Sequence, residues 1–154
     1  MASHDATISW KRGDASFADG KYSRFHEISF DGGAIMPGSS SPSVVREPMS
    51  RADAVDPEEM LVAALSSCHM LTFLDLARRD GFVIDSYVDA AKGVMEKIGE
   101  HRFALTRVTL RPQIAWGGDK RPTPAELEDL HHRSHELCFI ANSFKGDVTV
   151  EAAP

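Results

Sequence analysis

The sequence has few cysteines, no large excess of charge and no apolar run long enough to cross a membrane. Two cysteines among 154 residues are too few for a disulfide scaffold. A formal net charge of −6 argues against a nucleic-acid-binding surface. The longest apolar run without a charge, residues 60–74, is shorter than the roughly 20 residues of a spanning helix. We therefore expect a globular protein with no nucleic-acid and no membrane partner.

The first residues of the chain indicate its cellular compartment, and its length indicates the number of domains. Met1 to Asp5 lack the basic start and apolar run of a signal peptide. We therefore expect a cytoplasmic protein, in which thiols stay reduced and a cysteine pair is catalytic, redox-active or metal-binding. Because 154 residues suit one domain and no internal repeat is visible, we expect a single domain over residues 1–154.

The first of two helical segments begins at Asp56-Pro57, with Glu58 and Glu59 in its first turn. An N-cap Asp, a Pro at the first position and early acids are all typical of a helix start. Gly81 predicts its end. The body is apolar almost all the way round, which predicts a helix buried at the centre of the domain.

The second helical segment begins with Thr123-Pro124-Ala125-Glu126, a capping box with Pro at the first position. An apolar stripe at helical spacing runs from Leu127 to Ala141 and includes Cys138. Cys68 lies within the first helix. Both sulfurs should therefore point into the same core.

Period-2 alternation predicts strands in the rest of the chain. The order of strands, helix, strands, helix and strand predicts an α+β fold in which the sheet packs against two helices. The predicted strand segments are residues 7–11, 21–30, 83–97, 104–114 and 144–151.

Cys68 is the first candidate for chemistry, although a cysteine in an apolar helix is most often an inert small hydrophobe. Burial raises the pKa of a thiol, so a reactive Cys68 requires a nearby cation that favours the thiolate. Arg24 shares a strand face with Ile28 and Phe30, and it points to the core if they do. A position in solvent is the alternative for Arg24, and Arg12 in the preceding turn is an alternative cation.

Glu58 is the candidate carboxylate partner of such an arginine, although a first-turn acid also suits the helix dipole. Glu58 and Cys68 are ten residues apart, which is about 15 Å along a helix, and they lie on different faces. If both serve one site, Glu58 acts through an arginine or comes from a second subunit. This spacing indicates a dimeric site.

The histidines allow a competing chemistry. His131, His135 and Cys138 are spaced i, i+4 and i+7 on the second helix, and Cys68 would complete a two-His, two-Cys zinc set. This spacing allows a zinc site but is not specific for one, and the sequence has no C-x-x-C motif. Histidines at such positions more often lie on a solvated side of a helix.

Three motifs stand out when the chain is taken as a whole. They are Asp56-Pro57-Glu58-Glu59, Ala63-Ala64-Leu65-Ser66-Ser67-Cys68-His69-Met70 and His135-Glu136-Leu137-Cys138-Phe139-Ile140-Ala141-Asn142-Ser143. Together they resemble the OsmC/Ohr family of osmotically inducible and organic hydroperoxide resistance proteins. The resemblance covers about Ile8 to Val150. The family's glutamate stands at the same ten-residue spacing before its peroxidatic cysteine, which selects Glu58 over Glu59.

The resemblance implies an intertwined homodimer of antiparallel sheets packed on two central helices, with both active sites at the subunit interface. It also implies a thiol peroxidase that reduces organic hydroperoxides, in which Cys68 is peroxidatic and Cys138 is resolving. Cys138 would capture the Cys68 sulfenic acid as a disulfide, and an external dithiol of the lipoyl type would regenerate the pair. No metal or other cofactor is implied.

The family's arginine, which Glu58 would hold, lies in the N-terminal hairpin or just ahead of the central helix. This chain offers Arg12, Arg24, Arg46 and Arg51. We favour Arg24 for its inward face and keep Arg12 as the weaker alternative, because its place in the first turn matches the hydroperoxide-resistance branch.

Two other hypotheses are carried forward. A non-enzymatic binding module would hold a metal on His131, His135, Cys138 and Cys68, or a small apolar ligand in a buried pocket. A purely structural dimeric stress protein would keep both cysteines inert.

Overall fold

The computed structural model describes residues 1–151, which divide into two compact units. The N-terminal unit comprises residues 1–60, and the C-terminal unit begins at Leu61. Helix α1 (Pro57–Arg79) starts in the first unit and continues into the second. Each unit is described by itself below, and the single domain over residues 1–154 stays a prediction.

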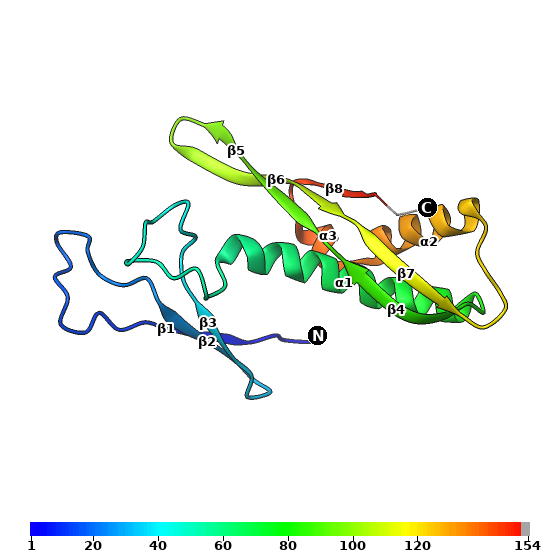
Figure 1. The fold of residues 1–154 in the computed structure, drawn as a ribbon, viewed down its shortest axis with the longest axis horizontal. Helices are drawn as coiled ribbons and strands as arrows, with labels where there is room; N and C mark the ends of the chain where they lie inside the picture. Colours follow the sequence, from blue (N-terminus) through cyan, green and yellow to red (C-terminus); the bar gives the residue numbers. More distant parts are fainter. Residues whose placement is uncertain (152–154) are drawn as a thin grey trace. The chain divides into compact units, whose positions relative to one another are not determined.

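The N-terminal unit contains a three-stranded antiparallel sheet (Figure 1). Strands β1 (Ala6–Ser9), β2 (His26–Phe30) and β3 (Ile35–Gly38) are hydrogen-bonded in this order. The first two predicted strands are confirmed over part of their length, as β1 and β2, whereas β3 has no counterpart in the sequence prediction. Residues 21–25 are not strand, because Ser23 Oγ accepts from the Phe25 N–H and the Arg24 N–H donates to the Met49 carbonyl at 2.7 Å.

The hydrophobic core of the N-terminal unit is very small. Ile28 is 2% exposed and Ala54 9% exposed, and they are the buried hydrophobic residues of this unit. Many larger apolar side chains of the same unit are exposed, namely Ile8, Trp10, Phe17, Phe30, Ile35 and Val44. A three-stranded sheet with so little buried apolar surface is marginal by itself.

Local chemistry fixes both ends of α1 as predicted. Asp56 Oδ1 accepts from the Glu59 N–H at 2.7 Å, and Glu59 Oε2 accepts from the Asp56 N–H at 3.1 Å. This reciprocal pair is a capping box. At the other end Gly81 adopts a positive φ of 79°, which a residue with a Cβ rarely adopts, and the Phe82 N–H donates to the Ala77 carbonyl.

The middle of α1 differs from the prediction of burial on every side. Its buried residues are Leu65, His69, Phe73, Leu76 and Ala77, which form one side of the helix. Leu71 on another side is 61% exposed. By length and composition alone α1 could cross a membrane. Its buried side nevertheless packs within the C-terminal unit, as the core helix of a globular fold does.

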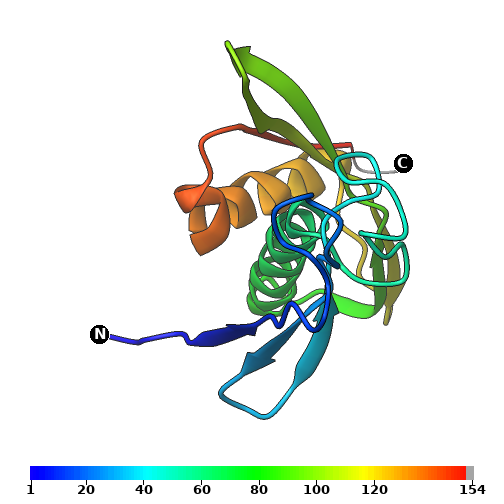
Figure 2. The same ribbon diagram turned by 90° about the vertical axis from the view of Figure 1, so that its left-hand side faces the viewer.

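Helix α2 (Pro124–Leu137) also begins as predicted, with Thr123 as N-cap and a capping box to Glu126. The predicted continuous helix to Ala141 is wrong, because the chain is extended at Cys138 and a short helix, α3 (Phe139–Ser143), follows. Figures 1 and 2 show α2 alongside the part of α1 that belongs to the C-terminal unit.

The predicted long strands of the C-terminal unit are each divided. The segment 83–97 forms β4 (Val83–Asp89) and part of β5 (Lys92–Gly99), and 104–114 forms most of β6 (Arg102–Leu110) and the start of β7 (Pro112–Gly117). The strand predicted over 144–151 is confirmed only as β8 (Asp147–Val150).

These strands form two sheets. β4 pairs with β7 and β5 pairs with β6, both antiparallel, whereas β8 lies parallel to β6.

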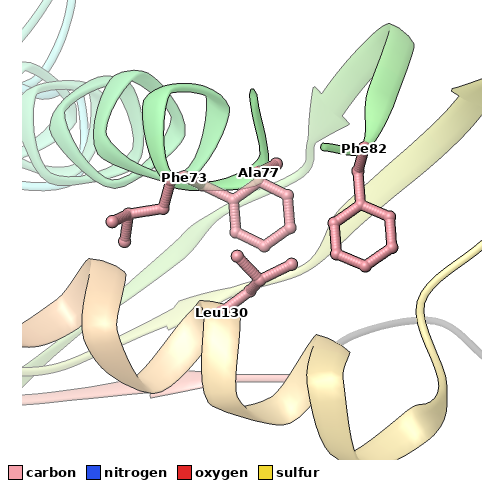
Figure 3. Packing of buried hydrophobic residues seen from close by; sticks show 5 residues of the cluster. Phe73, Ala77, Phe82 and Leu130 are labelled. Carbon is pink, nitrogen blue, oxygen red and sulfur yellow. The ribbon is translucent and has the colours of Figure 1, made fainter. Parts of the chain in front are cut away.

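Two clusters of buried residues hold the C-terminal unit together. In the first, Phe73 and Ala77 of α1 meet Leu130 of α2 and Phe82, the residue just before β4 (Figure 3). In the second, Leu65 of α1 packs with two fully buried β6 residues, Val108 and Leu110. The α+β architecture predicted from the order of elements is therefore confirmed.

Candidate active site

The C-terminal unit brings the two cysteines together, as their inward positions predicted. Both are free thiols; Cys68 is partly exposed, and Cys138 is only 1% exposed. Burial and, to a smaller extent, the neighbouring Cys68 side chain raise the pKa of the Cys138 thiol to about 11. Cys138 is therefore a protonated thiol at neutral pH, and Cys68 is the thiol that a dissolved molecule reaches first.

The break between α2 and α3 positions Cys138. Its backbone adopts φ −71° and ψ 112°, which ends α2 and starts α3. Its Sγ accepts a hydrogen bond from the Ala141 N–H at 3.4 Å, so the sulfur serves as an N-cap. The side chain is thereby held in the interior, although the residue no longer continues the helical stripe.

The two first-turn glutamates of α1 have different environments. The Glu59 carboxylate is used by the capping box with Asp56. Glu58 is half-buried and forms no salt bridge among residues 1–151. The role of Glu58 as the partner of an arginine stays a prediction.

Arg24 lies in the loop before β2 and is partly buried. Its Nη1 donates to the Gly20 carbonyl at 2.6 Å and to the Tyr22 carbonyl at 2.5 Å. The guanidinium carbon also lies 3.9 Å from the centre of the Tyr22 ring, a cation–π contact. Across the described residues Arg24 has no carboxylate within salt-bridge distance, so it is held by carbonyls and an aromatic ring.

The other candidate arginines are more exposed. Arg12 and Arg46 are both exposed, and neither forms a salt bridge among residues 1–151. Arg51 pairs with Asp53 at 2.6 Å, and this partner raises its pKa. Glu58 and the arginines belong to the N-terminal unit, whereas the cysteines belong to the C-terminal unit.

A buried histidine pair is a feature that the sequence analysis missed. His69 Nε2 lies 3.1 Å from His131 Nδ1, and the two residues are 1% and 5% exposed. Burial lowers the pKa of each ring to about 4, so both are neutral at pH 7. The position of His69 on α1, next to Cys68, is the only signal in the sequence, since its partner is 62 residues away.

The pairing of His131 with His69 also explains why the four proposed zinc ligands are not brought together. His131 is directed at His69 and stacked on Phe73, with ring centres 4.5 Å apart. Among residues 1–151, no three His, Cys, Asp or Glu side chains are grouped so that they could hold a metal ion. The set of His131, His135, Cys138 and Cys68 is therefore not assembled.

The sequence profile of OsmC-like proteins matches residues 50–153. That match includes both cysteines and Glu58. The chain belongs to the OsmC/Ohr family. Among curated proteins, the uncharacterized protein YmaD of Bacillus subtilis is 22% identical over 124 residues, covering 79% of this chain and 82% of YmaD.

Solved structures show that this OsmC-like chain has the fold of its family. An OsmC-like protein of unknown function from Vibrio cholerae is 46% identical, with a TM-score of 0.96 over 99% of this chain and 100% of that one. An organic hydroperoxide resistance protein from Legionella pneumophila has a TM-score of 0.69 at 17% identity, over 99% of this chain and 96% of that one. One from Elizabethkingia anophelis has a TM-score of 0.71 at 19% identity, over 99% and 94%.

Proposed function

We propose that this OsmC-like protein is a thiol peroxidase that reduces organic hydroperoxides. One observation carries the proposal: two free cysteines are neighbours in the C-terminal unit and differ in burial. A peroxidatic thiol has to meet the peroxide, which suits the partly exposed Cys68. A resolving thiol has to stay close by in reduced form, which suits the buried Cys138.

The reaction runs in three steps. The Cys68 thiolate attacks the outer oxygen of the hydroperoxide, the O–O bond breaks, and the alkoxide takes a proton and leaves as an alcohol. Cys68 is now a sulfenic acid, and the Cys138 sulfur displaces its hydroxyl as water to form a disulfide. An external dithiol, which we propose to be lipoyl-type, then reduces this disulfide by exchange and is itself oxidised to a disulfide.

Glu58 and an arginine support the Cys68 thiolate in this proposal. A guanidinium favours the charged form of a neighbouring thiol and can donate to the peroxide oxygens. Arg24 is the preferred residue, because it is half-buried and has no carboxylate partner within residues 1–151. Arg12 is the weaker alternative.

We also propose a homodimer. The buried hydrophobic residues of the N-terminal unit are only Ile28 and Ala54, while six large apolar side chains besides Met1 are exposed there. A second copy of the chain would cover such a surface. We propose that the protein works in the cytoplasm, because dithiol reductants there keep such cysteines reduced.

Stopped-flow kinetics with cumene hydroperoxide and reduced lipoamide tests the peroxidase. We expect saturable turnover that is abolished in Cys68→Ser and limited to the first step in Cys138→Ser. Ser67→Ala, an exposed neighbour on α1, is the matched control and should keep the full rate. Hydrogen peroxide should react more slowly, because the apolar helices around Cys68 favour alkyl groups. An unchanged rate in Cys68→Ser would overturn the proposal and leave the cysteines as inert core residues.

A further inference from the structure

One side-chain hydrogen bond joins helices α1 and α2, and it lies beside the two thiols. His69 Nε2 on α1 is 3.1 Å from His131 Nδ1 on α2, and both residues are buried. No other hydrogen bond connects a residue of α1 with a residue of α2 within residues 1–151. The Arg133–Asp80 ion pair, at 2.5 Å, links α2 only to the chain just after α1 ends. The histidine pair is therefore the directional contact that sets how these helices meet near the cysteines.

The histidines and the cysteines occupy consecutive places along the same interface. Cys68 directly precedes His69 on α1, and its side chain lies next to that of Cys138. Cys138 follows His131 by seven residues, which is about two helical turns and the same side of α2. The placement of α2 on α1 that brings the rings together therefore also brings the sulfurs together.

The hydrogen bonds that fix the shape of the chain at Cys138 are local. The residue is the C-cap of α2, and its backbone is extended. Its N–H donates to the His135 carbonyl at 3.3 Å, and its Sγ accepts from the Ala141 N–H at 3.4 Å. These bonds place the sulfur relative to α2 and α3. Its distance from the Cys68 sulfur thus depends on how the last turns of α2 are fastened to α1.

Two apolar side chains would be the simpler way to fill the place of the histidine pair in the core. His69 and His131 are 1% and 5% exposed, and His131 Nε2 is buried without a hydrogen-bond partner among residues 1–151. Burying such polar groups is unfavourable, and apolar groups of similar shape in both places are often neutral or more stable. An apolar pair has no preferred angle, however, whereas a hydrogen bond fixes both angle and distance. The histidine pair therefore contributes geometry more than stability.

We propose that the His69–His131 hydrogen bond positions Cys138 against Cys68 for disulfide formation. This role deepens the proposed function, because it rests on the pairing of the two cysteines in the second step. In that step the two sulfurs bond, the S–O bond of the Cys68 sulfenic acid breaks, and the hydroxyl leaves with the Cys138 proton as water. The histidines exchange no proton or electron in this step. They are positioning residues, which raise the effective concentration of one sulfur at the other.

Disulfide exchange with glutathione tests this positioning without a peroxide. At pH 7 the two thiols of the full-length protein become one internal disulfide, while one oxidised glutathione becomes two reduced ones. The double variant His69→Leu/His131→Phe replaces both polar side chains and keeps a ring against Phe73. Its exchange constant should fall by about tenfold or more. The free energy of unfolding of its reduced form should stay the same or rise. A merely structural role predicts that these two quantities change together.

Single variants supply a rescue and a control. His131→Asn places an amide where Nδ1 lies, so it keeps a hydrogen bond to His69 and should recover most of the native exchange constant. His131→Phe lacks this bond and should not recover it. Asp80→Asn is the matched control, because it removes the charge from the other polar link to α2. It should leave the exchange constant within about twofold of the native value.

The kinetics of the peroxide reaction assign the effect to the second step. After one equivalent of cumene hydroperoxide, the double variant should form the Cys68 sulfenic acid at the native rate, because the first step does not involve Cys138. The sulfenic acid should then persist about tenfold longer than in the native protein. Trapping with dimedone at successive times, followed by intact mass, measures both rates.

The positioning role would be overturned by a native exchange constant in the double variant, by an equal loss in Asp80→Asn, or by the absence of an internal disulfide in the native protein. If the double variant does not fold, the comparison of His131→Asn with His131→Phe decides the question. A native protein that forms the internal disulfide with glutathione but is not oxidised by the hydroperoxide would overturn the peroxidase alone.

Discussion

At the scale of single residues, the most unusual feature is the buried histidine pair beside Cys68. His69 and His131 share one hydrogen bond, so one ring nitrogen donates and the other accepts, which requires at least one neutral ring. Burial is the main cause of the low pKa of His69; the nearby His135 contributes to it, and Asp89 opposes it. The pair is therefore a neutral core element at pH 7.

The histidine pair predicts a loss of stability in mild acid. In the unfolded chain both rings take up protons near pH 6.5, whereas in the folded chain they do so near pH 4. The unfolded state thus binds more protons between these values, and the stability present above pH 6.5 declines as the pH falls. Urea unfolding should show a loss of about 2–4 kcal/mol between pH 7 and pH 5.

A pair of variants assigns this pH dependence. His131→Phe removes one of the two buried rings that titrate and should flatten the profile. His132→Gln is the matched control, because the His132 side chain next to it is 68% exposed and should leave the profile unchanged. A steep decline that persists in His131→Phe would show that other groups are responsible.

At the residue level, the choice of Glu58 over Glu59 came from the resemblance to the family and stays a prediction. The structure shows that the Glu59 carboxylate accepts from the Asp56 N–H. The histidine pair could not be predicted, because nothing near His69 in the sequence indicates a partner 62 residues away.

At the scale of elements, helix starts were predictable and interiors were not. Pro57 and Thr123 mark starts through capping chemistry that involves only the next few residues. The break at Cys138 has no such signal, because the apolar stripe continues past it in the sequence. β3 was missed for a related reason: its strand character comes from pairing with β2.

The apolar stripe of α2 gives a prediction about packing. Leu130 is fully buried in the core cluster with Phe73, whereas Leu137 on the predicted same stripe is 55% exposed. Leu130→Ala should lower the free energy of unfolding by about 2–5 kcal/mol, since it leaves a cavity. Leu137→Ala, the matched substitution on the same helix, should cost well under half as much. Equal losses in urea unfolding would contradict the packing described here.

At the scale of the whole molecule, the α+β class followed from the order of elements, but the strand partners did not. The parallel pairing of β8 with β6 joins segments about 40 residues apart, and only tertiary packing decides such a pairing. The same limit applies to the second subunit, which the sequence indicates only through the ten-residue gap between Glu58 and Cys68.

A complementation experiment tests whether two chains build each site. Glu58→Gln and Cys68→Ser are each expected to lack peroxidase activity. If Glu58 of one chain serves Cys68 of the other, a mixed dimer holds one intact site, and a refolded equimolar mixture should regain about a quarter of the native rate. A mixture of Cys68→Ser with Cys138→Ser serves as the control, because both changes fall within the same cysteine pair. No recovery in the first mixture would contradict a site shared between subunits.

The most direct test of the account is the intact mass of the protein after one equivalent of cumene hydroperoxide. Direct attack by Cys68 and capture by Cys138 predict a single chain lighter by two hydrogens, with one intramolecular Cys68–Cys138 disulfide that reduced lipoamide reverses. Cys138→Ser should instead gain one oxygen, on Cys68. The account would be contradicted by an unchanged mass, with both thiols still free to react with an alkylating reagent after denaturation. A covalent dimer in place of the internal disulfide would also contradict it.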